Sequence, residues 1–415
     1  MNVFVLNCGS SSVKFQVINT DLDLFETDSD RCVAKGLIEK VGTKEAIIGL
    51  QAGDGAPFKA VEPIADHREA ILRIKAWMEE PTTKIAGVHG WDDLHGIGHR
   101  VVHGAEKFTK AVKIDGEVLK QIEECADLAP LHNPANLKGI HACTEIFGDK
   151  IPQVAVFDTS FHSTMAEDVY LYAIPYDLYA KYKVRRYGFH GTSHRYVAYR
   201  YRKVVGVPRE KVNVITLHLG NGSSACAVKA GKSVNTTMGM TPLEGLIMGT
   251  RSGDIDAALV EYFAAKGLGS VTDIFNILNK KSGVLGVSGV SNDMRDVEKA
   301  AAEGNHRAAL ALTMFANRVK KYIGAYYAEL NGCEAVIFTA GIGENGAKIR
   351  SMICSNLEAL GIEIDEARNA EAVRGKLMKI SKDGCKTAVY VIPTNEELLL
   401  ARDAVRVIRD VPREW

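Results

Sequence analysis

The stretch Gly220-Asn221-Gly222-Ser223-Ser224 lies between two apolar runs, residues 212–219 before it and 225–228 after it. The two runs predict buried strands that are joined by a turn of glycines and hydroxyl side chains. Such a turn presents a concave row of backbone N–H groups, which binds anions and above all phosphate. We therefore expect a phosphate-binding hairpin at this point of the chain.

The same element occurs a second time, close to the N-terminus. Leu6-Asn7-Cys8-Gly9-Ser10-Ser11 aligns with Leu219-Gly220-Asn221-Gly222-Ser223-Ser224, and strand-like runs again lie on both sides. Two copies about half a chain apart indicate two related domains, each of which offers a phosphate-binding hairpin to a cleft between them. A chain of 415 residues is also too long for one ordinary hydrophobic core.

Composition is that of an ordinary soluble globular protein, with 46% hydrophobic and 25% charged residues. Lys+Arg and Asp+Glu both number 51, so net charge gives no reason to expect a nucleic acid or an anionic membrane as partner. No apolar run is long enough to span a membrane, and the first residues lack the features of a signal peptide. The eight scattered cysteines form no Cys-x-x-Cys pair and predict reduced thiols in the cytoplasm.

Two arginines in glycine-flanked segments are candidate anion ligands. Arg100 lies within the strand-like segment 97–104, and a charge inside an apolar strand usually meets a local anion. A surface salt bridge is the alternative. Arg251 lies in the glycine-rich turn 249–256, where Asp254 or Asp256 is expected to cap the following helix.

Three histidines, His95, His99 and His103, follow one another at intervals of four residues. On a helix this spacing would present a metal-binding face. The glycines and the paired valines around them favour a strand instead, so a zinc site is the lesser hypothesis.

Further polar residues lie where ligands are often bound. Residues 185–194 contain two arginines, two histidines, two hydroxyls and two glycines, which suits phosphate, with a solvated basic loop as the alternative; a helix over 196–204 should follow. Asp158 ends a buried strand, where it either faces a ligand crevice or caps the next turn. Asn133 suits the N-cap of a helix to about residue 147, and Thr394 or Asn395 suits that of the last helix.

The run Gly341-Ile342-Gly343-Glu344-Asn345-Gly346 lies between a predicted strand, 335–340, and a helix predicted to continue to about residue 360. Read alone, it matches the dinucleotide fingerprint of a Rossmann-type dehydrogenase. That reading leaves both serine-rich hairpins unexplained. In either fold, the run predicts a backbone that closely approaches a nucleotide.

Together these features indicate phosphoryl transfer, in which a protein mainly supplies positioning and charge stabilisation. The sequence contains neither a Gly-x-x-x-x-Gly-Lys-Ser/Thr loop nor a Gly-x-Ser-x-Gly elbow. A carboxylate acceptor would explain the lack of an obvious general base, because it is already ionised at pH 7. It would need cationic clamps, which Arg100 and Arg251 could supply.

Several long motifs resemble the acetokinase family of the acetate and sugar kinase/actin-like ATPase superfamily. They begin with Asn7-Cys8-Gly9-Ser10-Ser11-Ser12-Val13-Lys14, continue through residues 98–104, 187–194, 218–224, 241–246, 249–254 and 341–345, and end with Pro393-Thr394-Asn395-Glu396-Glu397. The resemblance implies an α/β fold of two actin-like (ribonuclease H-like) domains of duplicated topology, with an active-site cleft between them. Residues 1–160 with 396–415 would form the first domain and 161–395 the second. Ala105, where glycine is common, is a small departure in the acceptor region.

The activity that the resemblance implies is reversible, direct in-line transfer of a phosphoryl group from ATP to acetate, which gives acetyl phosphate and ADP. Magnesium would be the cofactor, with manganese as a substitute, and the protein would be a homodimer. A preference for propionate is the near alternative, although Val102 favours acetate. Pyrophosphate as donor and a non-catalytic nucleotide-binding module are less favoured.

Residue roles also follow from the resemblance. His190, Arg251, Arg100 and Asp158 would be catalytic, and Asn7 and Glu396 would hold the metal, with Glu397 as the neighbour that could take that role. Arg100, Val102, Leu131, Phe189 and Pro242 would form the acceptor site. The ATP-binding residues would be Lys14, Ser12, His218, Leu219, Gly220, Asn221, Gly222, Asp293, Met294, Arg295, Gly341, Ile342, Gly343 and Asn345.

Overall fold

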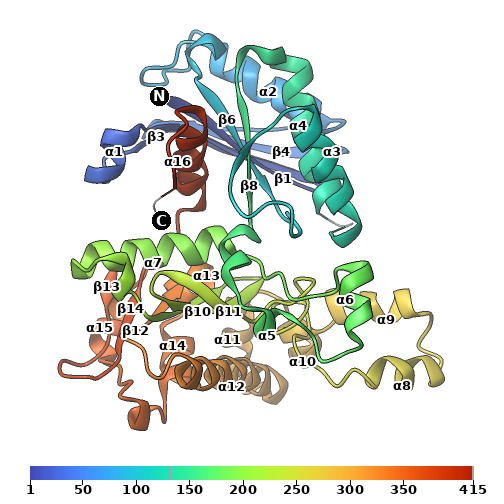
Figure 1. Ribbon diagram of the computed structural model, residues 1–415, viewed down its shortest axis with the longest axis vertical. Coiled ribbons are helices and arrows are strands. Elements are labelled where there is room, and N and C mark those ends of the chain that lie inside the picture. The colour runs from blue at the N-terminus through green and yellow to red at the C-terminus, as the bar shows by residue number, and fades with distance from the viewer. Residues whose placement is uncertain (130–131, 414–415) are drawn as a thin grey trace. The chain divides into compact units, whose positions relative to one another are not determined.

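The structure is a computed structural model that describes residues 1–129 and 132–413, and its chain forms two compact α/β units (Figure 1). The first unit contains Met1–Ser160 together with the chain from Asn395 onward, and the second contains Phe161–Thr394. In the described part of the chain, no helix is both long and apolar enough to cross a membrane.

The first unit is built on an eight-stranded sheet of order β5-β4-β3-β2-β1-β6-β8-β7. The strands β1, β6 and β8 are parallel neighbours, whereas β2 to β5 continue the sheet as antiparallel strands. Its strands are β1 Asn2–Gly9, β2 Ser12–Asn19, β3 Arg31–Glu39, β4 Thr43–Ala52, β5 Phe58–Ile64, β6 Gly96–Val101, β7 Val112–Lys113 and β8 Gln153–Phe157. Its helices are α1 Leu22–Thr27, α2 His67–Glu79, α3 Gly116–Glu124, α4 Asn133–Phe147 and α16 Glu396–Ile408.

Helices cover both faces of this first sheet. Alternate residues of β1 point to opposite faces: Val3 and Val5 contact the apolar face of α16, while Phe4 and Leu6 belong to the core formed with α2 and α4. The glycines of β6 permit a close approach, since a Cβ at Gly98 would lie 3.4 Å from a backbone oxygen of α16.

The second unit is built on a six-stranded sheet of order β11-β10-β9-β12-β14-β13. The long helix α12 covers one face of it through a large apolar core, and α7 contacts β9. The strands are β9 Val214–Leu219, β10 Ser223–Lys229, β11 Lys232–Thr236, β12 Ala335–Thr339, β13 Met378–Lys379 and β14 Ala388–Val391. The helices are α5 Glu167–Tyr170, α6 Tyr176–Tyr182, α7 Gly191–Val205, α8 Leu259–Ala265, α9 Val271–Lys280, α10 Gly283–Ser288, α11 Met294–Ala302, α12 His306–Glu329, α13 Ala340–Asn345, α14 Ala347–Cys354 and α15 Glu366–Glu371.

The two sheets repeat one topology. The order β3-β2-β1-β6-β8-β7 of the first matches β11-β10-β9-β12-β14-β13 of the second, and each pair of neighbours has the same parallel or antiparallel sense. Both serine-rich turns join antiparallel strands, β1 to β2 and β9 to β10. The expected pair of hairpins and the duplicated fold are therefore confirmed.

The chain crosses twice between the two units, and each crossing is followed by a helix that packs on the sheet of the unit it enters: α7 in the second unit and α16 in the first. After β8, the last parallel strand of the first sheet, the chain enters the second unit and forms α7 there. After β14, the equivalent strand of the second sheet, it returns and forms α16 on the first sheet. Each unit is thus completed by a helix that follows the other unit's last parallel strand.

Several local predictions are wrong in their detail. The α7 helix begins at Gly191 rather than at residue 196, and α14 ends at Cys354 rather than near residue 360. The Gly341–Gly346 run is not an extended loop, because α13 spans most of it. Asn133 is the first residue of α4 and not its N-cap, since its side chain bonds the backbone of His103.

Two other local predictions are confirmed. Asn395 caps α16 by accepting a hydrogen bond from the Leu398 amide. His99 lies on strand β6 and not on a helix, so the three histidines do not share a helical face. The described residues contain no group of three or more His, Cys, Asp or Glu side chains that could hold a metal ion.

A Gly139→Ala substitution tests the contact between α4 and β1. The new Cβ would lie 2.5 Å from Sγ of buried Cys8, so we expect overpacking to destabilise the protein by about 1–3 kcal/mol. Thermal melting would measure the effect. The matched control is Gly324→Ala in α12, where no atom lies within 4 Å and a gain of about 0.5–1 kcal/mol is expected. Equal melting temperatures for the two variants would contradict this description of the contact.

His99 provides a test of pH dependence. Burial lowers its pKa to about 4, although the hydrogen bond to Gln153 partly opposes this shift. Between pH 4 and the unfolded pKa near 6.5, the unfolded chain binds the extra proton, so stability falls as the pH drops through this window. The loss is on the order of 3 kcal/mol. We expect His99→Gln to flatten the dependence of the melting temperature on pH, whereas His141→Asn, at a half-exposed histidine, should leave it unchanged.

Candidate active site

In the first unit, the candidate residues gather at one edge of the sheet. Asn7 lies near the end of β1, Arg100 near the end of β6, and Asp158 directly after β8. Because these three strands are parallel neighbours, their carboxyl ends meet at the same edge, where ligands bind in open α/β sheets.

Arg100 forms a bidentate ion pair with Asp158. Its Nε lies 3.0 Å from Oδ1 and its Nη2 lies 2.5 Å from Oδ2, while Nη1 donates to Asn7 Oδ1 at 3.2 Å. Burial alone would lower the pKa of Arg100, but the Asp158 carboxylate outweighs it and, with Glu396 and Glu397, raises the pKa. The guanidinium is therefore charged and fixed in orientation. Asp158 thus forms an ion pair with Arg100 through both of its carboxylate oxygens.

The segment after β6 is held by two asparagines of α4. The Val102 amide donates to Asn136 Oδ1 and the His103 amide to Asn133 Oδ1, both at 3.0 Å. Val102 is buried. Leu131, the other residue of this unit expected in the acceptor pocket, lies outside the described residues. Ala105 has φ 49°, a conformation that favours glycine, so this departure from the family pattern carries local backbone strain.

Residues expected to bind phosphate or metal in this unit have further contacts. Lys14 projects from β2 and pairs with Glu397. Glu396 is the first residue of α16. Ser12 faces Gly9 across the first hairpin, and a Cβ at Gly9 would lie 2.8 Å from the Ser12 hydroxyl. The hairpin is thus compact, and its backbone is open only to a small group.

In the second unit, three elements converge on Gly222 of the second hairpin. A Cβ placed on Gly222 would lie 3.4 Å from Nε2 of His190 and 3.6 Å from Nη1 of Arg251. His190 precedes α7 and has a left-handed backbone, and Arg251 comes from the long loop after β11. The structure therefore brings the hairpin, the predicted histidine and the predicted arginine to one point.

Arg251 differs from Arg100 because no described carboxylate forms an ion pair with it. Its Nη1 donates to the Pro242 carbonyl at 3.2 Å, which is a neutral partner. Burial alone lowers the pKa of Arg251 from its ordinary value. Arg251 is half-buried, and a partly desolvated guanidinium without a counter-charge is a strong site for an anion, since the ligand supplies the missing charge.

The His190 ring is held by polar side chains. Its Nδ1 lies 2.8 Å from Ser224 Oγ, and the same hydroxyl lies 2.7 Å from Nε2 of His194. His190 also stacks on His218, with ring centroids 4.0 Å apart. Burial first, and then the neighbouring His162 and His218, lower the pKa of His194 well below its ordinary value. His194 is therefore a neutral hydrogen-bonding support for the ring beside Gly222.

A pocket of about 480 Å³ adjoins the second hairpin within this unit. Most of the residues that were expected to bind ATP line it: Gly220, Asn221, Asp293, Met294, Arg295, Gly341, Ile342 and Asn345. Arg295 hydrogen bonds lower the pKa of Asp293 to about 2. Gly343 and Leu219 are not lining residues of this pocket; they are neighbours in its wall, where a Cβ on Gly343 would lie 3.7 Å from the Leu219 Cβ.

Two lining residues were missed by the sequence analysis. Asn292 donates to Asn221 Oδ1 at 3.1 Å and so orients that side chain. Glu298 has a buried carboxylate oxygen, Oε1, that meets no hydrogen-bond donor among the described residues, and burial raises its pKa. Glu298 could have been predicted as a lining residue, because it lies four residues after Met294 and therefore on the same face of the helix.

The acceptor-side residues Phe189 and Pro242 belong to the second unit. Phe189 is buried directly before His190, and Pro242 bonds Arg251 through its carbonyl. Val102 belongs to the first unit. The structure thus divides the predicted acceptor residues between the two units.

The chain is similar to known proteins over almost its whole length. The model of the acetokinase family matches residues 2–402. The acetate kinase of Chloroherpeton thalassium is 52% identical over 414 residues, which cover 98% of this chain and 99% of that protein.

Solved structures agree with this result. The crystal structure of Porphyromonas gingivalis acetate kinase has a TM-score of 0.91 and 43% identity, with 98% of this chain and 99% of that chain covered. A propionate kinase from Francisella tularensis has a TM-score of 0.88 and 42% identity, with coverage of 99% and 100%. With its duplicated sheets and convergent hairpin, histidine and arginine, the chain belongs to the acetokinase family.

Proposed function

We propose that the protein catalyses the reversible transfer of the γ-phosphoryl group of ATP to acetate, which gives acetyl phosphate and ADP. The observation that carries this proposal is the half-buried Arg251 guanidinium, which has no carboxylate partner among the described residues and lies beside Gly222 and His190. Membership of the acetokinase family supports it. A transferring phosphoryl group is an anion of the size and charge that such a point can stabilise.

The acceptor needs no general base in this reaction. Acetate is ionised at pH 7, so one carboxylate oxygen can attack the γ-phosphorus directly. A new P–O bond to acetate forms while the P–O bond to the β-phosphate breaks, and ADP leaves with that electron pair. The protein's task is to align the two oxygens and to neutralise the charge between them.

Residues of both units would share this task. Arg251 would stabilise the charge on the transferring group, and His190, held by Ser224, would donate from Nε2 beside Gly222. Arg100, oriented by Asp158, would bind the carboxylate of acetate. Val102, Phe189 and Pro242 would surround its methyl group. The first unit would thus be the acceptor side and the second the nucleotide side.

A divalent magnesium ion fits the donor set at the edge of the first sheet. Asn7 Oδ1 and the Glu396 carboxylate are hard oxygen ligands, which magnesium prefers, and manganese can replace it at such ligands. When bound, the ion would neutralise charge on the nucleotide phosphates. Asn7 Oδ1 already accepts a hydrogen bond from Arg100, so the same residue would link the ion and the acceptor arginine.

The pocket beside the second hairpin is the proposed nucleotide site. Asn221, oriented by Asn292, and the backbone of Gly220 would meet the phosphates, while Met294 and Ile342 offer apolar surface for the base. Glu298 Oε1, which has no hydrogen-bond donor in the described part of the chain, could accept from a donor of the base or the ribose.

Propionate is the second candidate acceptor, because a propionate kinase is among the similar structures. We also propose a cytoplasmic homodimer. The eight cysteines are all free thiols, as expected for a reducing compartment, and the dimer is implied by the family resemblance.

The reaction is tested by trapping acyl phosphate with hydroxylamine. With ATP and magnesium, we expect hydroxamate from acetate at a higher kcat/KM than from propionate, by about 10–200-fold, and less from butyrate, because one methylene is weakly discriminated. A reaction without acid is the control. No product above this control would refute the proposal, and a higher value for propionate would favour the second candidate.

The two arginines are tested by replacement with alanine. We expect Arg251→Ala to lower kcat by about 10³–10⁵, because a transition-state arginine has an effect of that size. Arg100→Ala should lower kcat/KM for acetate by a comparable factor, with little change in KM for ATP. Arg368→Ala, which removes an exposed ion pair with Asp383, is the control. Turnover within about tenfold of wild type in Arg251→Ala would contradict the mechanism.

A further inference from the structure

The loop of residues 237–254, which carries Arg251, contains no helix or strand although it is 18 residues long. Loops of this length inside a compact domain are uncommon and usually functional. Much of this loop is nevertheless buried, including Leu246, Ile247 and Met248. Something other than regular secondary structure must therefore hold its backbone.

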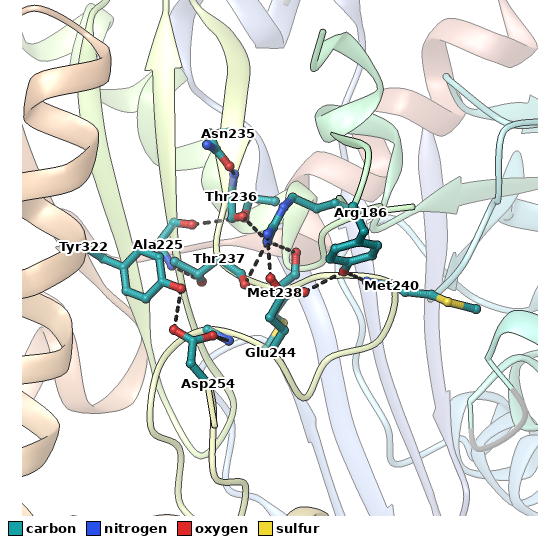
Figure 2. Close-up of polar contacts among 12 residues, drawn as sticks. Arg186, Ala225, Asn235, Thr236, Thr237, Met238, Met240, Glu244, Asp254 and Tyr322 are labelled. Carbon is teal, nitrogen blue, oxygen red and sulfur yellow. Dashed lines mark hydrogen bonds and ion pairs between the residues drawn. The ribbon is translucent and has the colours of Figure 1, made fainter. Parts of the chain in front are cut away.

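Arg186 and Glu244 form one anchor of this loop (Figure 2). Arg186 Nη1 donates to the carbonyls of Thr236, Thr237 and Met238 at 2.9, 3.1 and 3.4 Å, and its Nη2 lies 2.5 Å from Glu244 Oε1. One guanidinium thus joins the backbone that enters the loop to the side chain of Glu244, six to eight residues further along the chain.

Tyr172 completes this first anchor. Its hydroxyl donates to Glu244 Oε2 at 2.5 Å and accepts from the Met240 amide at 2.9 Å. Both carboxylate oxygens of Glu244 are therefore occupied, and burial together with this carboxylate raises the pKa of Tyr172, so the hydroxyl stays protonated.

Asp254 forms a second anchor at the far end of the loop (Figure 2). Its Oδ2 accepts from the Tyr322 hydroxyl at 2.6 Å and its Oδ1 accepts from the Gly245 amide at 2.7 Å. Gly245 and Gly253 have φ of +102° and +67°, and a Cβ at either would lie about 2.5 Å or less from a backbone oxygen of the loop. Gly245, in the middle of the loop, is thus packed closely against Thr237 at its start and against Gly253 near its end.

Pro242 links the first anchor to the arginine. It lies between Met240 and Glu244, both held by Tyr172, and its carbonyl accepts from Arg251 Nη1 at 3.2 Å. This carbonyl is the polar backbone contact that orients the unpaired guanidinium. If Glu244 is removed, the Pro242 carbonyl loses its support and the guanidinium loses its direction.

We propose that Arg186 and Glu244 are positioning residues for Arg251: their ion pair fixes the loop so that the guanidinium points at the transferring phosphoryl group. This inference rests on the proposed function of the site. The expected effect is kinetic, because a displacement of about 1 Å can cost about 10²-fold in rate. It should fall on kcat and on the KM for acetate, since Pro242 is also an acceptor-site residue, and spare the KM for ATP.

A double-mutant cycle tests the proposal with the hydroxamate assay. We expect Glu244→Ala to lower kcat by about 10–100-fold in the wild-type background and by less than about twofold in the Arg251→Ala background, since the arginine it positions is then absent. Glu244→Gln, which keeps the shape and one acceptor oxygen, should recover part of the loss. The control is Glu62→Ala, which removes an ion pair with Arg73 of similar exposure (36% and 21%, against 31% and 17% for Glu244 and Arg186).

The outcomes separate a positioning role from a structural one. An equal loss in both backgrounds, or a raised KM for ATP of the same size, would mean that Glu244 supports the fold only and would overturn the inference. This result would leave the proposed function intact, because wild-type turnover is measured in the same assay. Melting temperatures of all variants identify any that fail to fold, and Glu244→Gln then provides the kinetic readout.

Discussion

The second unit holds the Arg251 guanidinium half-buried and without a carboxylate partner among the described residues, and the surrounding loop is built around this charge. Removing a cation from water is costly unless a counter-charge or hydrogen bonds replace the lost solvation. Here the partners of the guanidinium are neutral: the Pro242 carbonyl at 3.2 Å and the Met248 sulfur at 3.7 Å. The cost is offset by anchors elsewhere in the loop, so that the unsatisfied charge is held in place before any ligand arrives.

In the first unit, the arginine has a carboxylate partner. Arg100 is compensated by Asp158 through two hydrogen bonds, which fix the plane of the guanidinium. An anion therefore gains less from Arg100 than from Arg251, but it meets a group whose direction is already set. One arginine suits recognition of a substrate that binds throughout the cycle, and the other suits a charge that develops only during transfer.

The sequence predicted those features that depend on neighbouring residues. Both hairpins follow from a glycine and hydroxyl turn between apolar runs. The repeated turn predicted two related domains, and the family resemblance implied their duplicated topology. Asn395 was recognised as a cap because its partner lies three residues away. Asn133 matched the same N-cap pattern in the sequence. In the structure, however, its side-chain amide exchanges hydrogen bonds with the backbone of His103, 30 residues away.

Features that depend on distant partners could not be predicted. Arg186 and Glu244 are separated by 58 residues, and Tyr322 and Asp254 by 68, so no local pattern marks either anchor. The Gly341–Gly346 run was expected to form a turn, because glycines favour one, but α13 spans most of it. A helix forms there with the Glu344 carboxylate accepting from the amides of Ala340 and Thr394, and Thr394 lies on a segment 50 residues away.

The exchange of α7 and α16 between the units has a consequence for synthesis. The face of the first sheet that carries Val3, Val5, Val154 and Val156 is covered by Leu400, Ala401 and Ala404, which the ribosome adds after all strands of the second unit. The first unit is therefore completed only after every strand of the second unit has been made, because α16 follows β14 in the chain. Until α16 has been made, this apolar face is exposed to chaperones and to other nascent chains. The synthesis and docking of α16 therefore end the period in which this face can promote aggregation.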